Sequence, residues 1–247
     1  MKKALVTGGH KRLGKAIALA LVQAGYDVAV HYRRDPEAAE AVVAAAHAQG
    51  RRAIALAAEL TDATALPALV AAAAEHLGGL SLLVLAAASY EPTPVDALDG
   101  AQLDRAFAQN ARAQVELMLA ARPYLAHSGD GRVVVLGDLA GQIPFTGYLA
   151  HSMAKAALHA AVRGLATELA PEITVNAIVP GAVLQPDDLP DATWQRLLAV
   201  VPQGQAMRDD PTAGSQAIAQ AVVYLAQCSR FINGAFHTVD GGRTARW

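Results

Sequence analysis

The chain has 247 residues, with 20 Lys plus Arg against 22 Asp plus Glu and a formal net charge of −2. This charge balance excludes a basic surface for nucleic acid, and the 53% share of hydrophobic residues excludes a disordered chain. The single cysteine, Cys228, cannot form an internal disulfide, which is typical of a reducing compartment, so we expect a cytoplasmic protein.

Apolar runs of strand length alternate with longer alanine-rich stretches of helical length. The expected strands cover residues 3–7, 27–31, 52–57, 81–85, 132–136, 173–178 and 236–239. The expected helices cover residues 12–24, 36–49, 63–77, about 102–126, 148–169 and 212–227. This alternation predicts right-handed βαβ units and a parallel sheet that is buried on both faces. We therefore predict one α/β domain over residues 1–247, a doubly wound Rossmann sheet of about seven parallel strands with helices on both faces.

Two stretches near the end of the chain need separate interpretation. The stretch 180–211 contains five prolines and no regular pattern, so we expect a substrate loop or lid over the pocket at about residues 182–211. The longest stretch without a charged residue, 211–229, opens with proline and contains three glutamines. It therefore indicates an amphipathic helix rather than a membrane span.

The turn after the first strand reads TGGHKRLG, from Thr7 to Gly14. Glycines at this place let the backbone approach a pyrophosphate, which then lies against the free N–H groups of the helix N-terminus. We expect Gly8, Arg12 and Leu13 to contact a dinucleotide there. The alternative is a tight turn without a ligand, but such a turn needs one glycine rather than three.

The end of the second strand indicates which dinucleotide binds. Proteins that select NAD place Asp or Glu there, next to the ribose 2′-hydroxyl. This chain instead reads HYRR, and Lys11 and Arg12 approach from the first turn. Guanidinium groups bind a 2′-phosphate through charge-assisted hydrogen bonds, so we expect NADPH, with a solvated basic loop as the alternative. The candidate contacts are His31, Tyr32, Arg33 and Arg34, among which the strand-end position favours Arg33 for the phosphate.

These residues resemble the short-chain dehydrogenase/reductase family, and the resemblance covers nearly the entire chain. The first turn is similar to the family's TGxxxGxG pattern, with Arg12 in place of the middle glycine. The further matches are Glu59-Leu60 and Pro180-Gly181 for the cofactor, Asn110 and Lys155 for catalysis, and VDGG at 239–242. The resemblance implies a homotetramer that acts on a small-molecule substrate.

Within this family, the chain is most similar to the pteridine reductases and the related dihydromonapterin reductases. Arg12, the HYRR sequence, Asp138 and the sequence PDDLP at 186–190 carry this resemblance. It implies NADPH-dependent reduction of a pterin or a similar flat heterocycle.

Two segments depart from the family pattern. The YxxxK motif reads HSMAK here, so His151 stands where the family has its catalytic tyrosine. The segment after the fourth strand has Ala86 and Ala87 in place of two asparagines. Backbone groups of these alanines can still contact the adenosine part of a cofactor.

A reductase of this family transfers a hydride from nicotinamide to a carbonyl or imine carbon and protonates the partner atom. By resemblance, Lys155 holds the nicotinamide ribose and Asn110 holds a water for proton supply. His151 lies one helical turn before Lys155, and the nearby ammonium disfavours the protonated imidazole that an acid requires. Asp138 either pairs with His151 or donates a proton itself, and Tyr148 is a third possible donor.

The remaining candidates concern the substrate and other classes of function. Tyr90 is expected to stack on a flat substrate beside Asp138 and Tyr148, although both tyrosines could equally be core aromatics. The other histidines lack ligand spacing, so we expect no metal site. The alternatives to a pterin reductase are a reductase of another carbonyl compound and an NADP(H)-binding protein without redox activity, which serves as a sensor or assembly subunit.

Overall fold

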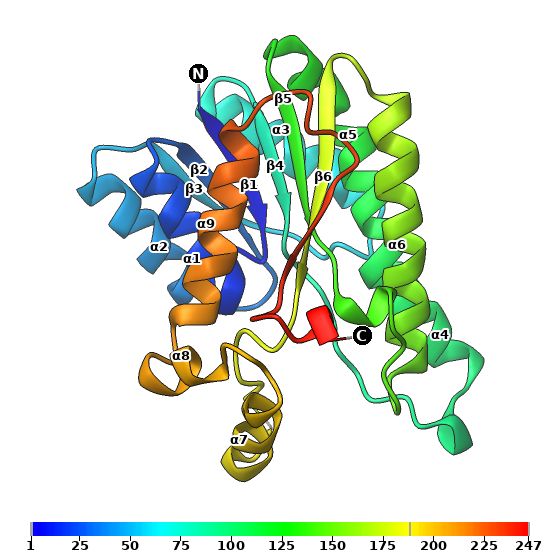
Figure 1. Ribbon diagram of the computed structural model, residues 1–247. Helices are drawn as coiled ribbons and strands as arrows, with labels where there is room; N and C mark the ends of the chain where they lie inside the picture. Colours follow the sequence, from blue (N-terminus) through cyan, green and yellow to red (C-terminus); the bar gives the residue numbers. More distant parts are fainter. Residues whose placement is uncertain (1, 188, 247) are drawn as a thin grey trace.

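The computed structural model describes residues 2–187 and 189–246, and it confirms the predicted parallel sheet (Figure 1). Seven strands pair in the order β3-β2-β1-β4-β5-β6-β7, and every neighbouring pair is parallel. They are β1 (Lys3–Thr7), β2 (Asp27–Tyr32), β3 (Ala53–Ala57), β4 (Leu82–Leu85), β5 (Gly131–Leu136), β6 (Ile173–Pro180) and β7 (Phe236–Val239). All seven expected strands are present, with ends that differ by at most two residues from the predicted ones.

Helices cover both faces of this sheet, as the alternation of strands and helices predicts (Figure 1). One face packs against α1 (Arg12–Gln23), α2 (Pro36–Ala48) and α9 (Ala213–Gln227). The other face packs against α3 (Ala65–Leu77), α5 (Ala113–His127) and α6 (Leu149–Glu168). Strands β1, β4 and β5 are buried along their whole length, which is why they are continuous apolar runs rather than alternating ones.

The helix expected at about 102–126 is interrupted. The chain forms α4 (Gly100–Phe107), then a π-helical turn η2 (Ala108–Arg112), and then α5. A π-helical turn adds a residue to the helical repeat and is common at functional sites. It turns Asn110 inward, where the side chain is buried, so the prediction of one continuous helix is wrong at this point.

The segment 182–211 is more regular than the sequence predicted. It contains α7 (Asp191–Ala199) and α8 (Gly204–Asp209), and both lie at the carboxyl ends of the strands (Figure 1). Trp194, Leu198 and Met207 form a small apolar cluster of their own, which stabilises these short helices. Asp188, within the PDDLP sequence, lies outside the described residues.

The strand order places β1 and β4 side by side at the centre of the sheet, although they are far apart in sequence. Such a reversal of strand order leaves a crevice at the carboxyl ends of the strands, where ligands bind in doubly wound folds.

Within residues 2–187 and 189–246, no helix is long and apolar enough to cross a membrane.

Candidate functional site

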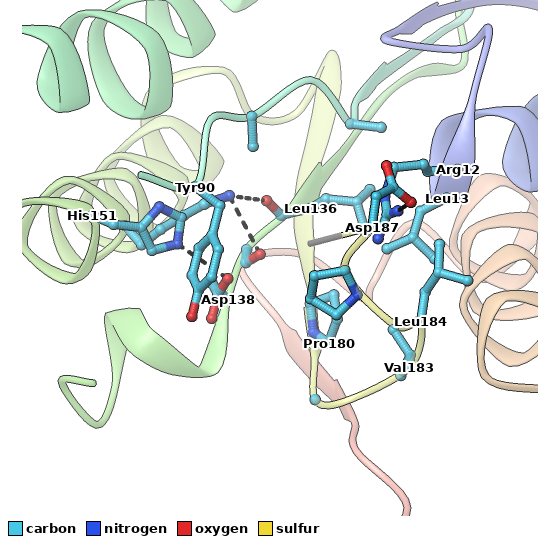
Figure 2. A pocket seen from close by; sticks show the side chains of 16 residues that line it. Arg12, Leu13, Tyr90, Leu136, Asp138, His151, Pro180, Val183, Leu184 and Asp187 are labelled. Atoms are coloured by element: carbon cyan, nitrogen blue, oxygen red, sulfur yellow. Dashed lines mark hydrogen bonds and ion pairs between the residues drawn. The ribbon is translucent and has the colours of Figure 1, made fainter. Parts of the chain in front are cut away.

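A pocket of about 540 Å³ opens at the carboxyl ends of β1, β4, β5 and β6. Its walls come from the first turn, the loop after β4, the end of β5, helix α6 and the beginning of the segment 182–211 (Figure 2). Nine residues predicted for the site line it, namely Arg12, Leu13, Ala86, Tyr90, Asp138, His151, Lys155, Pro180 and Gly181. Four residues of the expected substrate loop line it as well, namely Val183, Leu184 and, from the PDDLP sequence, Pro186 and Asp187. The sequence did not single out Ala88, Leu136 and Gly137, which also line it.

The glycine-rich turn has the geometry that a pyrophosphate needs. Gly8 has a φ of +64°, and a β-carbon on Gly14 would lie 2.1 Å from the carbonyl oxygen of Gly8, so only glycine lets α1 approach the turn this closely. No side chain of Lys11, the residue before α1, caps the first N–H groups of that helix. Uncapped N–H groups at a helix N-terminus favour an anion, so this turn fits the diphosphate of a dinucleotide.

His31 supports this turn from behind. Its Nδ1 accepts a hydrogen bond from the Gly8 N–H at 3.0 Å, and its Nε2 donates to the Ala58 carbonyl at 3.1 Å. Burial lowers the pKa of His31, in keeping with a neutral ring. The sequence predicted direct contact between His31 and the cofactor. The structure instead engages both ring nitrogens inside the protein.

The basic residues at the cofactor end have different partners. Arg33 lies 3.6 Å from Glu59, a carboxylate that also accepts hydrogen bonds from Thr61. Arg34 is exposed and forms no ion pair with the described residues. Arg34 is therefore the freer cation of the two, while the choice of Arg33 for a 2′-phosphate stays a prediction.

Arg12 points into the pocket and crosses to the segment 182–211. Its guanidinium lies 2.5 Å from the Asp187 carboxylate and 2.9 Å from the Gln185 carbonyl oxygen (Figure 2). Arg12 has a φ of 50°, a left-handed conformation that costs a non-glycine residue about 1–2 kcal/mol. The residue at the family's glycine position therefore keeps the glycine-like backbone and adds a charged side chain.

The loop after β4 is held by side chains from elsewhere in the fold. The Thr7 hydroxyl oxygen accepts hydrogen bonds from the N–H groups of Ala86 and Ala87, at 3.0 and 3.1 Å. The buried Gln114 donates to the Ala87 carbonyl at 3.1 Å. Asn110 holds the next part of the loop through Ser89. These contacts fix the loop although its own side chains at 86 and 87 are only methyl groups.

His151 has hydrogen-bond partners at both ring nitrogens. Its Nδ1 lies 3.0 Å from the Ser89 carbonyl oxygen, and its Nε2 lies 3.2 Å from Asp138 Oδ2. A carbonyl oxygen only accepts hydrogen bonds, so Nδ1 carries a proton. The contact between Nε2 and Oδ2 also needs a proton, which either the ring or the carboxyl group supplies. The pair therefore holds one proton between its two members, at the wall of the pocket.

Lys155 and Asp138 set the charge around this proton. Lys155 is buried and donates to the carbonyl oxygens of Leu136 and Gly137, at 2.9 and 3.4 Å. Burial lowers the pKa of Lys155, and the Asp138 carboxylate opposes that effect. Burial raises the pKa of Asp138, but the hydrogen bond from His151 and the charge of Lys155 outweigh it, so the pKa lies below its usual range. The carboxylate is thus the favoured form of Asp138.

His159 lies behind Asp138 and was not singled out from the sequence. Its Nε2 faces the Asp138 backbone N–H at 3.4 Å, and its ring packs edge-on against Phe236. β-Carbons on Gly137 and Gly141 would lie within 2.6 and 2.8 Å of this ring, so the two glycines make room for it. Burial, together with Lys155 and Arg163, lowers the pKa of His159 to about 4. The signal in the sequence was its position, four residues after Lys155 on one helix face.

Tyr90 lines the pocket together with Asp138, and Tyr148 is not among the residues that line it. Tyr90 stacks on Tyr148 with ring centroids 4.2 Å apart, and its edge meets the His151 ring at 4.9 Å. Tyr90 is nevertheless 46% exposed, so the ring is available to a ligand in the pocket. Burial, followed by the neighbouring Tyr148 and Asp138, raises the pKa of Tyr90 and keeps its hydroxyl protonated.

Within the described ranges, no group of three or more His, Cys, Asp or Glu residues could hold a metal ion.

The chain is similar to a known protein family and to single proteins over nearly its whole length. The model of a family described as enoyl-(acyl carrier protein) reductase matches residues 9–244. An uncharacterized oxidoreductase of Mycobacterium tuberculosis is 36% identical, over 98% of this chain and 92% of its own length. Pteridine reductase 1 of Leishmania tarentolae is 33% identical, over 97% of this chain and 95% of its own length.

Two solved structures show the same likeness in three dimensions. FolM alternative dihydrofolate reductase 1 from Brucella suis, in complex with NADP, has a TM-score of 0.90 and 32% identity, covering 100% of this chain and 96% of that one. A short chain dehydrogenase from Burkholderia cenocepacia, also in complex with NADP, has a TM-score of 0.87 and 36% identity, covering 98% of this chain and 97% of that one.

The low pKa of His159 makes stability depend on pH. Between about 4 and 6.5, the unfolded chain binds a proton on this imidazole that the folded chain excludes. The free energy of unfolding therefore decreases as the pH falls from 6.5 toward 4. His159 contributes on the order of 2 kcal/mol to this decrease. We expect His159→Gln, which keeps a hydrogen-bond acceptor, to flatten this dependence in urea unfolding. Exposed His47→Gln is the control, and equal pH dependence in all three proteins would contradict the assignment.

Proposed function

The chain belongs to the short-chain dehydrogenase/reductase family, and from that membership we propose that it is an NADPH-dependent reductase of a pterin or a similar flat heterocycle with a C=N bond. The observation that carries the proposal is the Asp138–His151 pair, which holds one proton at the wall of the pocket. When bound, NADPH supplies the hydride. The residues of this chain orient the two reactants and supply the proton.

The cofactor choice rests on the charges at the end of β2. No carboxylate stands at 31–34 to repel a 2′-phosphate, and Arg33 and Arg34 offer two guanidinium groups. The neighbours from Brucella suis and Burkholderia cenocepacia, which contain NADP, support this choice. Lys155 lines the pocket and donates two of its N–H groups to carbonyl oxygens, so the third N–H would bind the ribose hydroxyls.

The proton donor decides which substrates can react. A donor works best when its proton affinity matches that of the acceptor atom and the working pH. Imine nitrogens of a dihydropterin are more basic than a ketone oxygen, so an Asp–His pair suits them better than it suits a ketone. With a hydride from bound NADPH added to the carbon of the C=N bond, the Asp138–His151 pair would pass its proton to the nitrogen. Tyr90 offers its exposed ring as a stacking surface for a flat substrate.

The charges predict a measurable preference between the two nicotinamide cofactors. Fluorescence titration should show NADPH binding more tightly than NADH by roughly tenfold or more, which is about 1.4 kcal/mol. Replacing Arg33 and Arg34 by alanine should remove most of this preference, whereas Arg51→Ala, beyond α2, should leave it intact. Glu59→Gln frees Arg33 from its partner and should strengthen NADPH binding a few-fold. Equal affinity of the unaltered protein for both cofactors would refute the assignment.

A substrate panel separates the proposed function from its alternatives. With NADPH, the protein should reduce a dihydropterin and a cyclic imine faster than an aryl ketone, by roughly tenfold or more. His151→Tyr replaces the pair by a phenol, and we expect it to favour the ketone. Preference of the unaltered protein for ketones supports a reductase of another carbonyl compound. Tight NADPH binding without turnover of any substrate supports a protein whose redox activity has lapsed, and either result rejects the proposal.

A further inference from the structure

The side-chain amide of Asn110 is buried and makes its hydrogen bonds with Ser89. Its Oδ1 accepts the Ser89 backbone N–H at 3.0 Å, and its Nδ2 donates to the Ser89 hydroxyl at 3.1 Å. Asn110 is 1% exposed and stands in the π-helical turn η2, which brings it inward. Both hydrogen-bonding groups of the side chain thus grip one residue of the loop after β4.

Ser89 carries this constraint to the proton-holding pair. Its backbone N–H is bound by Asn110, and its carbonyl oxygen accepts the hydrogen bond from His151 Nδ1. With the Ser89 residue held in place, the ring is favoured in the state that has a proton on Nδ1. Nε2 then faces Asp138 Oδ2, which is where the pair needs its additional proton.

We propose that Asn110 is a positioning residue that fixes the tautomer of His151 through Ser89, and so keeps the shared proton between His151 and Asp138. The proposal deepens the proposed function and rests on it for the role of that proton. A neutral ring with its proton on Nε2 would satisfy the Asp138 carboxylate alone. The pair would then bind its additional proton more weakly, because Nδ1 would have lost its acceptor.

Several other titratable or aromatic groups surround the His151 ring, and a substitution at Asn110 leaves all of them in place. Asp138 and the edge of Tyr90 contact it directly. Lys155 lies one helical turn after His151 on α6, and Tyr148 lies about one turn before it, at the start of that helix. His159 lies behind Asp138. Among the described residues, the Asn110 side chain forms its hydrogen bonds with Ser89 and with none of these groups, so a change at 110 isolates the path through Ser89.

The direct test is long-range proton–nitrogen correlation NMR on histidine-labelled protein, with the His151 signal identified by its loss in His151→Phe. In the unaltered protein, Nδ1 should stay protonated from about pH 5 to about pH 9. Asn110→Leu removes both contacts to Ser89 and should populate the Nε2–H tautomer. Asn110→Ser is a second variant in case the first does not fold, because its shorter side chain does not span the two contacts. Asn110→Asp, which still accepts the Ser89 N–H, should restore the Nδ1–H state.

Gln114→Leu is the matched control, since Gln114 holds the same loop at Ala87 and not at Ser89. It should leave the tautomer unchanged. In the pH profile of kcat, the pH at which kcat falls by half should decrease by about one pH unit in Asn110→Ser. It should not change in Gln114→Leu. An unchanged Nδ1–H state in both Asn110→Leu and Asn110→Ser would overturn the proposal. Because NMR reads the tautomer without a substrate, failure of the proposed reductase activity would be distinguishable from failure of this inference.

Discussion

The hydrogen bond between His151 Nδ1 and the Ser89 carbonyl oxygen determines how the rest of the site can work. Since a carbonyl cannot donate, this contact commits one ring nitrogen to a proton and directs the other toward Asp138. The surrounding structure keeps both ends in place. Asn110 holds the Ser89 side of the ring, while the Ala140 N–H, at 2.8 Å from Oδ1, holds the Asp138 carboxylate. A pair built in this way stores a proton at a defined place without a phenol.

We propose that one end of the pocket binds the cofactor and the other end binds the substrate. At one end lie the uncapped start of α1, the glycine turn and the arginines, which suit the phosphates of a dinucleotide. At the other end lie Tyr90, Asp138 and His151, which suit a flat, basic heterocycle (Figure 2). Lys155, on α6, is a buried residue of the pocket wall. Arg12 joins the glycine turn to the segment 182–211 through Asp187 and Gln185.

The sequence was sufficient for the architecture because buried parallel strands and amphipathic helices leave strong patterns. It also singled out the polar side chains of the pocket wall, since Asp138, His151 and Lys155 follow motif spacing. It could not show the π-helical turn, because the alanine-rich stretch at 108–112 contains no glycine or proline to mark it. The role of Ser89 was equally invisible, because its contact with His151 and one of its two contacts with Asn110 use backbone groups that any residue could supply. His159 was overlooked because a buried histidine is more often a packing residue than a partner of the site.

The most direct test of the shared-proton account is hydride transfer in Asp138→Asn. An asparagine amide can still donate to His151 Nε2, so the geometry of the pair should survive, but the amide and the neutral ring have no proton to share. In a single-turnover experiment with bound NADPH and a dihydropterin, we predict that the rate falls by roughly a hundredfold or more while NADPH affinity stays within about threefold. A rate that stays within a few-fold of the unaltered protein across the pH range would contradict the account, because the proton would then come from another group.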